Sequence, residues 1–261
     1  LRITVLKMIA KAKSSHIGSN FSCADILTVL YDIADLSLMS NGLPKDIIIV
    51  KSWAIASVYA LLVKKGLLPQ EAIDNYGKEG TPWKTITEPL FDENGKRNPY
   101  VPWGIGSMGY NLPAAVGFAL AKKLKGEEGT VYCLISDGEC QIGSFYESLL
   151  IAKQHELSNL IILCDNNSWQ AMGRIKDILN LEPLNEKIKS FGWAVQRING
   201  HDYNQIENAL KNVDKTLPNF IICDTIKGMG YSKLYDNNLY HYKHVSEEEL
   251  NEALKELNNG I

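Results

Sequence analysis

Short apolar runs alternate with longer amphipathic segments between about residues 47 and 225. The runs predict five strands, at Ile47–Val50, Val131–Ile135, Leu160–Cys164, Ala194–Ile198 and Phe220–Cys223, and each is typical of a buried parallel strand. Helical patterns cover Leu112–Leu124, Ser144–His155, Leu184–Phe191, Tyr203–Val213 and the region near Glu247–Leu257, and Ser22-x-x-Asp25 indicates a further helix start. This alternation predicts an α/β fold, a parallel sheet with helices on both faces.

The pattern predicts one domain over residues 1–261. Residues 80–105 include the turn-rich stretch PLFDENGKRNPYVP and predict a long surface loop shaped like a lid. The segment after about residue 227 is a loop-like tail that leads to the last helix. Neither segment has the length of a second core.

Composition narrows the functional classes. The chain has 45% hydrophobic and 22% charged residues and a net charge of −3, values that argue against disorder and against nucleic-acid binding. Its five cysteines form no C-x-x-C pair, and the N-terminus does not resemble a signal peptide, so we expect a cytoplasmic protein. The uncharged stretch Val101–Ala121 contains four glycines and two prolines, which argues against a membrane span.

Polar residues follow three of the predicted strands. Val131–Ile135 leads into Asp137-Gly138, Leu160–Cys164 leads into Asp165-Asn166-Asn167, and Phe220–Cys223 leads into Asp224-Thr225-Ile226-Lys227-Gly228. Ligands of open parallel sheets bind outside the carboxyl ends of the strands, so one edge of the sheet is the expected site.

Asp137 and Asn167 offer hard oxygen ligands, which suit Mg²⁺ or Ca²⁺. Two such ligands are too few to hold the ion alone, so a phosphate would have to complete its shell. Gly138 permits a tight turn, and the helix predicted near Gly143 can point its N-terminus toward an anion. Taken singly, each of the two motifs is also an ordinary turn sequence.

The nucleotide-binding pattern Gly104-x-Gly106-x-x-Gly109 is an alternative anion site. That pattern requires a strand directly before it. Prolines at 99 and 102 precede it here and exclude a central strand, so a dinucleotide site is not expected.

The motifs taken together resemble those of transketolases, over roughly residues 14–245. They are Ser15-His16-Ile17-Gly18, Ser22-x-Ala24-Asp25-Ile26-Leu27, Gly106-Ser107-Met108-Gly109, Asp137-Gly138-Glu139, Asp165-Asn166-Asn167, Asn199-Gly200-His201-Asp202 and Thr225-Ile226-Lys227-Gly228 with His241. The resemblance implies a thiamine diphosphate-binding fold of the diphosphate type. It implies a transferase of aldehyde or ketone residues with thiamine diphosphate and Mg²⁺ (or Ca²⁺) as cofactors.

The resemblance also implies roles for individual residues. Asp137 and Asn167 would bind the metal through their side chains, and Trp169 through its backbone carbonyl. Gly138 would approach the diphosphate, and Gly106, Ser107 and Met108 would line the aminopyrimidine side. Lys51, Lys227 and His241 match positions near the diphosphate and the reacting carbon, while His16 matches a histidine that handles hydroxyl protons of the donor. A histidine titrating near neutrality suits that task.

The chain departs from the family where sugars are bound. Lys51-Ser52-Trp53 stands where transketolases have a histidine after Lys-Gly, and Glu88 precedes Pro89 where another histidine is expected. We expect Trp53 to narrow the pocket and to favour a less hydroxylated or ring-shaped substrate. The alternative is that Trp53 only packs at a helix start.

Full-length transketolases carry a second, pyrimidine-binding domain that supplies the activating glutamate, and nothing after Asn259 remains to form it. The resemblance therefore implies a separate pyrimidine-binding partner subunit, with two copies of each polypeptide. The expected reaction moves a two-carbon ketol unit between sugar-like substrates. A thiamine diphosphate enzyme with a 2-oxo acid donor and a catalytically silent scaffold are the alternatives.

Overall fold

The computed structural model describes residues 1–104 and 108–259 and contains a five-stranded parallel sheet in the order β1-β2-β3-β7-β6. The strands are β1 (Ile47–Val50), β2 (Val131–Ser136), β3 (Leu160–Asn166), β6 (Ala194–Asn199) and β7 (Asn219–Asp224). A separate antiparallel hairpin joins β4 (Trp169–Gln170) to β5 (Gly173–Arg174). The main sheet skips from β3 to the edge strand β6 and returns through β7, so β3 is its central strand.

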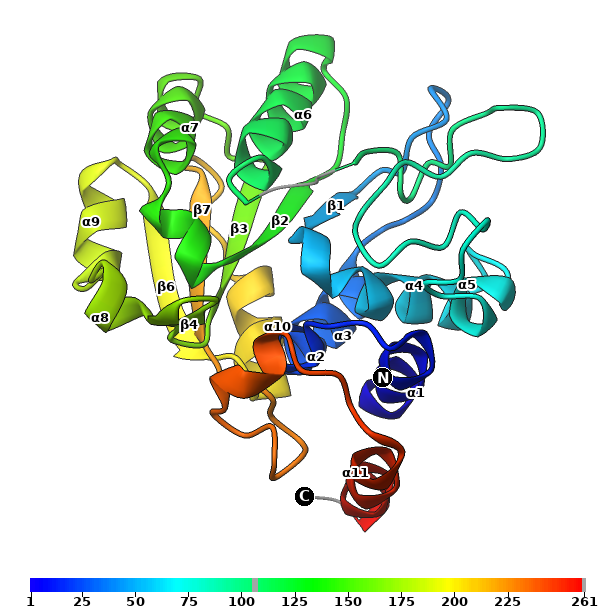
Figure 1. Cartoon of the computed structure of the whole chain (residues 1–261). Helices are drawn as coiled ribbons and strands as arrows, with labels where there is room; N and C mark the ends of the chain where they lie inside the picture. The colour runs from blue at the N-terminus through cyan, green and yellow to red at the C-terminus, as the bar shows by residue number, and fades with distance from the viewer. Residues whose placement is uncertain (105–107, 260–261) are drawn as a thin grey trace.

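Helices cover both faces of the sheet, as Figure 1 shows. One face packs against α6 (Asn111–Lys125), α7 (Gly143–Gln154) and α9 (Leu184–Ser190). The other packs against α3 (Ala24–Ile33), α4 (Ile55–Lys64) and α10 (Tyr203–Lys211), with α1 (Arg2–Ala12) and α2 (Ile17–Ser22) beside them. The remaining helices are α5 (Glu71–Asp74), α8 (Ile175–Ile178) and α11 (Glu247–Asn259), with 3₁₀ turns at Ser52–Ala54, Asp137–Gln141 and Asn238–His241.

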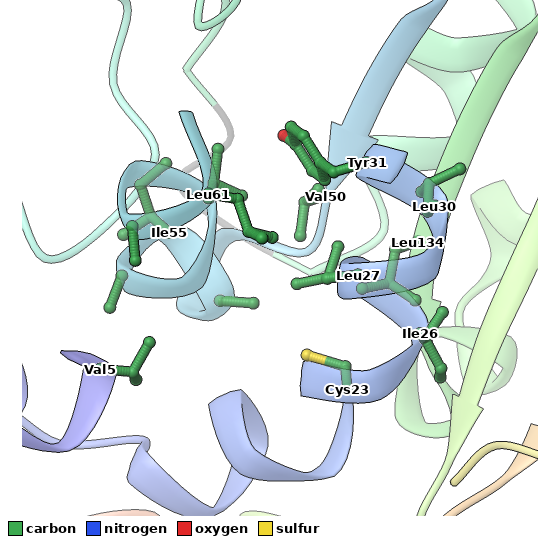
Figure 2. Close-up of a cluster of buried hydrophobic side chains, with 14 of the residues drawn as sticks. Val5, Cys23, Ile26, Leu27, Leu30, Tyr31, Val50, Ile55, Leu61 and Leu134 are labelled. Carbon is green, nitrogen blue, oxygen red and sulfur yellow. The ribbon is translucent and has the colours of Figure 1, made fainter. Parts of the chain in front are cut away.

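The strands divide their side chains between two apolar cores. In β3, Ile161 and Leu163 enter one core while Leu160 and Ile162 enter the other, because alternate strand residues point to opposite faces. Figure 2 shows the first core, where residues of α3 such as Leu27 and Leu30 meet Val50 of β1 and Leu134 of β2. This two-sided burial confirms the predicted α/β class.

All five predicted strands and the later helices form at their predicted positions to within a few residues, but two details differ. Ala194–Ile198 is not a fully buried strand, since β6 lies at the sheet edge and its residues are partly exposed. Ser22 does not start a helix. It ends α2, while α3 begins after Cys23, and the Ser22 hydroxyl donates to Asp165 over 2.6 Å. A tertiary contact therefore replaces the predicted cap.

The segment at 80–105 is irregular within its described part, with an isolated bridge between Phe91 and Arg97. Its Thr87 is buried, and the Thr87 backbone N–H donates to the Ser52 hydroxyl over 3.1 Å. The lid-like loop is thus anchored beside Lys51 and Trp53. The five cysteines are buried and unpaired, and none of the helices in the described part could cross a membrane. The division into one domain with a tail stays a prediction.

A buried carboxylate ties the N-terminal helix to the far end of the sheet. Arg2 donates two hydrogen bonds of 2.7 Å to Asp25, and His201 Nδ1 lies 2.8 Å from the same carboxylate. His201 Nε2 accepts the Ile226 backbone N–H over 2.9 Å, so Nδ1 holds the ring proton and donates it to Asp25. Burial alone would raise the pKa of Asp25, but the hydrogen bonds from His201 and Arg2 outweigh it and lower the pKa to about 2.

We predict that Asp25→Asn lowers the free energy of unfolding by about 1–3 kcal/mol near pH 7, because buried donors lose an ionised acceptor. A depressed folded-state pKa contributes stability that is present above the unfolded value near pH 4 and is lost as pH falls toward 2. The difference between the two proteins should therefore shrink over that interval in urea titrations. Asp32→Asn, at an exposed carboxylate of the same helix, is the control and should change stability by less than about 0.5 kcal/mol. A difference that stays constant from pH 7 to pH 2 would contradict this account.

Candidate functional site

A pocket of about 90 Å³ opens at the carboxyl edge of the sheet. Seven of the residues singled out from the sequence line it, namely Lys51, Trp53, Met108, Gly138, Asn167, Trp169 and His241. Asp137, His16 and Lys227 lie behind this wall and contact residues that line it. The structure therefore brings together side chains from strand ends that are far apart in the sequence, as the topology predicts.

Asp137 and Asn167 meet at the loop that follows β3. Asp137 is fully buried, and its two carboxylate oxygens accept backbone N–H groups of Gly138 at 2.8 Å and Ser168 at 2.6 Å. The side-chain oxygen of Asn167 accepts the Trp169 N–H over 3.1 Å. A carboxylate and an amide oxygen are thus held on one short loop, a donor set that suits a hard divalent cation.

The electrostatics of Asp137 also fit a cation. Burial raises the pKa of Asp137 to about 7, and the nearby Asp165 carboxylate adds to the rise. The Lys51 ammonium and the two backbone N–H groups oppose the shift without cancelling it. An ion bound at Asp137 would supply the missing positive charge. No cluster of three or more His, Cys, Asp or Glu lies in the described part, so the other ligands would be neutral groups or a bound phosphate.

Lys51 is buried and paired with Asp165. Its ammonium donates to the Asp165 carboxylate, and the two side chains are 6% and 0% exposed. Burial disfavours the charged lysine, yet the Asp165 carboxylate raises the pKa of Lys51 above its usual value. The lysine at the pocket wall is therefore a charged donor whose charge is already balanced within the protein.

Lys227 and His241 form a second pair on the opposite side of the pocket. The Lys227 ammonium lies 2.6 Å from the Asn238 side-chain oxygen and 2.9 Å from His241 Nδ1. Burial lowers the pKa of Lys227 to about 8, and Lys51 adds to the shift. The lysine stem fits because residue 18 is glycine; a Cβ there would lie 3.1 Å from Lys227 Cγ.

His16 stacks on Trp53 with ring centroids 4.2 Å apart and planes 8° apart, and its edge meets His241. Burial lowers the pKa of His16 to about 4 and that of His241 to about 3, and the Lys227 charge adds to both shifts. The expectation that His16 titrates near neutrality is therefore wrong for this structure. Both rings are neutral near pH 7.

The loop before α6 is pinned to the strand end of β2. The buried Glu139 carboxylate accepts the Gly109 N–H at 3.3 Å and the Asn111 amide at 3.0 Å. Gly109 has a φ of 87°, a conformation that favours glycine. Met108 lies next to it in the pocket wall, whereas the predicted positions Gly106 and Ser107 lie outside the described residues.

Trp169 sits in the β4–β5 hairpin, where its side chain is fixed from two sides. The indole N–H donates to Asp236 over 2.7 Å, and the Arg174 guanidinium lies 3.9 Å from the ring centroid. Arg174 also pairs with Asp236. The hairpin is thereby joined to the segment that carries Asn238 and His241. The predicted metal contact of the Trp169 carbonyl stays a prediction.

Three polar residues at the site received no role from the sequence. Asp165 contacts Lys51 and Asn167, Asn238 contacts Lys227, and Glu139 holds the loop at Gly109. Asp165 and Glu139 do stand within strand-end motifs, so their position was a usable signal. Asn238 lies in the loop-like tail, where nothing in the pattern distinguishes it.

Known relatives support this site. A family model described as transketolase, thiamine diphosphate binding domain matches residues 1–259. One of the two subunits named for apulose-4-phosphate transketolase in Actinobacillus succinogenes is 32% identical and aligns with 98% of this chain and 92% of its own length. The 6-deoxy-6-sulfo-D-fructose transketolase subunit SqwG of Clostridium sp. is 30% identical over 98% of this chain and 93% of its own length.

The fold gives the same assignment. The crystal structure of transketolase from Campylobacter jejuni superimposes with a TM-score of 0.84 at 28% identity, covering 98% of this chain and 41% of that longer one. The match extends over the sheet and both helical layers. With the family model spanning nearly every residue and the predicted strand-end motifs gathered around one pocket, the chain belongs to the transketolase family, as a thiamine diphosphate-binding domain.

Proposed function

We propose that this chain is the diphosphate-binding subunit of a thiamine diphosphate- and Mg²⁺-dependent enzyme that transfers a two-carbon ketol unit between sugar-like substrates. The observation that carries the proposal is the pairing of Asp137 and Asn167 on one loop beside the pocket. Their oxygens would hold Mg²⁺, or Ca²⁺, together with the diphosphate and the Trp169 carbonyl. Buried, unpaired cysteines support a cytoplasmic location.

Thiamine diphosphate supplies the carbanion chemistry when bound, and the protein supplies binding and orientation. Lys227 donates to His241 Nδ1, so the neutral His241 ring carries its proton on Nε2. His241 can then act as a hydrogen-bond donor through that nitrogen. His16 packs against it as a second neutral imidazole, which suits contacts to substrate hydroxyl groups.

A separate pyrimidine-binding subunit is part of the proposal. Both relatives named as subunits align over more than nine tenths of their length, whereas the single-chain transketolase of C. jejuni is matched over 41%. The pocket is far smaller than the roughly 300 Å³ or more that encloses a typical ligand, which suits a site completed by another surface. Met108 is 40% and Tyr242 is 63% exposed, apolar groups that such a surface could cover. Two copies of each subunit would give a closed symmetric assembly.

The substrate we propose is a modified sugar. Trp53 lines the pocket and stacks on His16, so an indole face occupies the position where the family has an imidazole. The relatives that align over nearly their full length are named for apulose 4-phosphate and for a sulfonated fructose. An apolar wall disfavours a substrate that presents a hydroxyl group there.

We expect Asp137→Ala to weaken binding of Mg²⁺ and thiamine diphosphate by about tenfold or more, because the site loses its carboxylate ligand. Calorimetric titration of the complex with its partner subunit measures this loss. Asp224→Ala, at the end of neighbouring β7, removes a carboxylate that pairs with Arg197 outside the pocket and serves as the control. Unchanged affinity in folded Asp137→Ala would sink the assignment.

The isolated chain should show no turnover with any ketol donor, and co-expression with the product of the neighbouring gene should restore it. Activity is measured across a donor panel, and mass measurement of the complex reports the copy number. Robust turnover by the demonstrably pure single chain would refute the need for a partner.

Replacing Trp53 by histidine should raise turnover of the assembled enzyme on xylulose 5-phosphate by about tenfold, since one regained hydrogen bond is worth about 1.4 kcal/mol. Trp53→Phe retains an apolar ring without an imidazole, and its turnover should stay low. Full activity of the unmodified enzyme on xylulose 5-phosphate would show that Trp53 has no gating role. Preference for a 2-oxo acid donor in the same panel would replace the sugar in the proposal.

A further inference from the structure

Asp165 is the most highly connected buried carboxylate of the site. It is fully buried at the end of β3, the central strand. One carboxylate oxygen accepts from the Ser22 hydroxyl at 2.6 Å, from the Asn167 amide at 3.2 Å and from the Lys51 ammonium, and the other accepts from the Thr225 hydroxyl. These donors come from α2, from the residue after β1, from the loop after β3 and from the segment after β7.

The contact with Asn167 determines how its amide is turned. A carboxylate only accepts hydrogen bonds, so the NH₂ group must face Asp165. A backbone N–H only donates, so the amide oxygen must face Trp169. The two contacts agree, and the amide has one satisfied orientation, with its oxygen on the side of the loop that also holds Asp137.

Charge balance explains why an ionised carboxylate can serve here. Asp165 lies near Asp137, and two buried carboxylates without a cation would repel each other. Lys51 donates to Asp165 and neutralises it. Asp137 is then the carboxylate left for a bound cation, while Asp165 remains a pure acceptor.

We propose that Asp165 is a positioning residue, which turns the Asn167 oxygen toward the bound cation while Lys51 balances its charge. This inference rests on the proposed function, because it concerns the same cation. Asp165 itself contacts four protein donors and is not offered as a ligand. Substitution by asparagine places an NH₂ group among those donors and removes the reason for the Asn167 amide to keep its orientation.

The test is a double-mutant cycle on the assembled complex, with the dissociation constant for Mg²⁺ measured calorimetrically at saturating thiamine diphosphate. Asp165→Asn should raise this constant by about ten- to a hundredfold, the range for partners that orient metal ligands. In the Asn167→Ala background the same change should have no further effect, because the residue through which Asp165 acts is gone. Asp224→Asn is the matched control and should leave the constant unchanged.

Thermal unfolding of each variant separates positioning from support of the fold. A lower melting temperature with unchanged Mg²⁺ affinity, or losses that add fully in the double variant, would overturn the inference. If Asp165→Asn does not fold, the comparison is made in the Lys51→Met background, where no buried ammonium lacks a partner. Failure of the unmodified complex to bind Mg²⁺ with thiamine diphosphate would overturn the proposed function instead.

Discussion

The buried ion pair between Lys51 and Asp165 is the contact on which the site depends. Each partner directly follows or ends a strand of the sheet, and both are almost inaccessible to water. Neither charge is tolerable there alone, so the pair constrains where β1 and β3 end relative to each other. Ser22 and Thr225 complete the shell of the carboxylate, which extends this constraint to α2 and β7.

Around this pair the site divides into a metal side and a histidine side. The metal side consists of Asp137 and Asn167, held by backbone N–H groups of one loop. The histidine side consists of His16 and His241, kept neutral by burial and by the charge of Lys227. The two sides are joined through Asn238, which accepts from Lys227 and donates to the Ala171 carbonyl over 3.2 Å. A family site is thus built from few ligands and many supporting hydrogen bonds.

The departure at Trp53 shows how this support permits a change of pocket chemistry. The Trp53 carbonyl accepts the Asn20 amide over 2.8 Å, so the backbone is held independently of the side chain. The indole then replaces an imidazole without disturbing Lys51, two residues earlier. Relatives of the same family can differ in the substrates they are named for while sharing the fold of this domain.

The sequence by itself determined the sheet, its order of strands and helices and the strand-end motifs, because burial imposes periodic apolar patterns and turns require particular residues. It did not reveal α1, α2 and α4, whose positions depend on packing against one another rather than on a clear pattern. Tertiary structure alone decided that Ser22 serves Asp165 rather than a helix start, and that His16 titrates near 4. Such outcomes depend on charges and donors from distant segments, which spacing along a chain does not record.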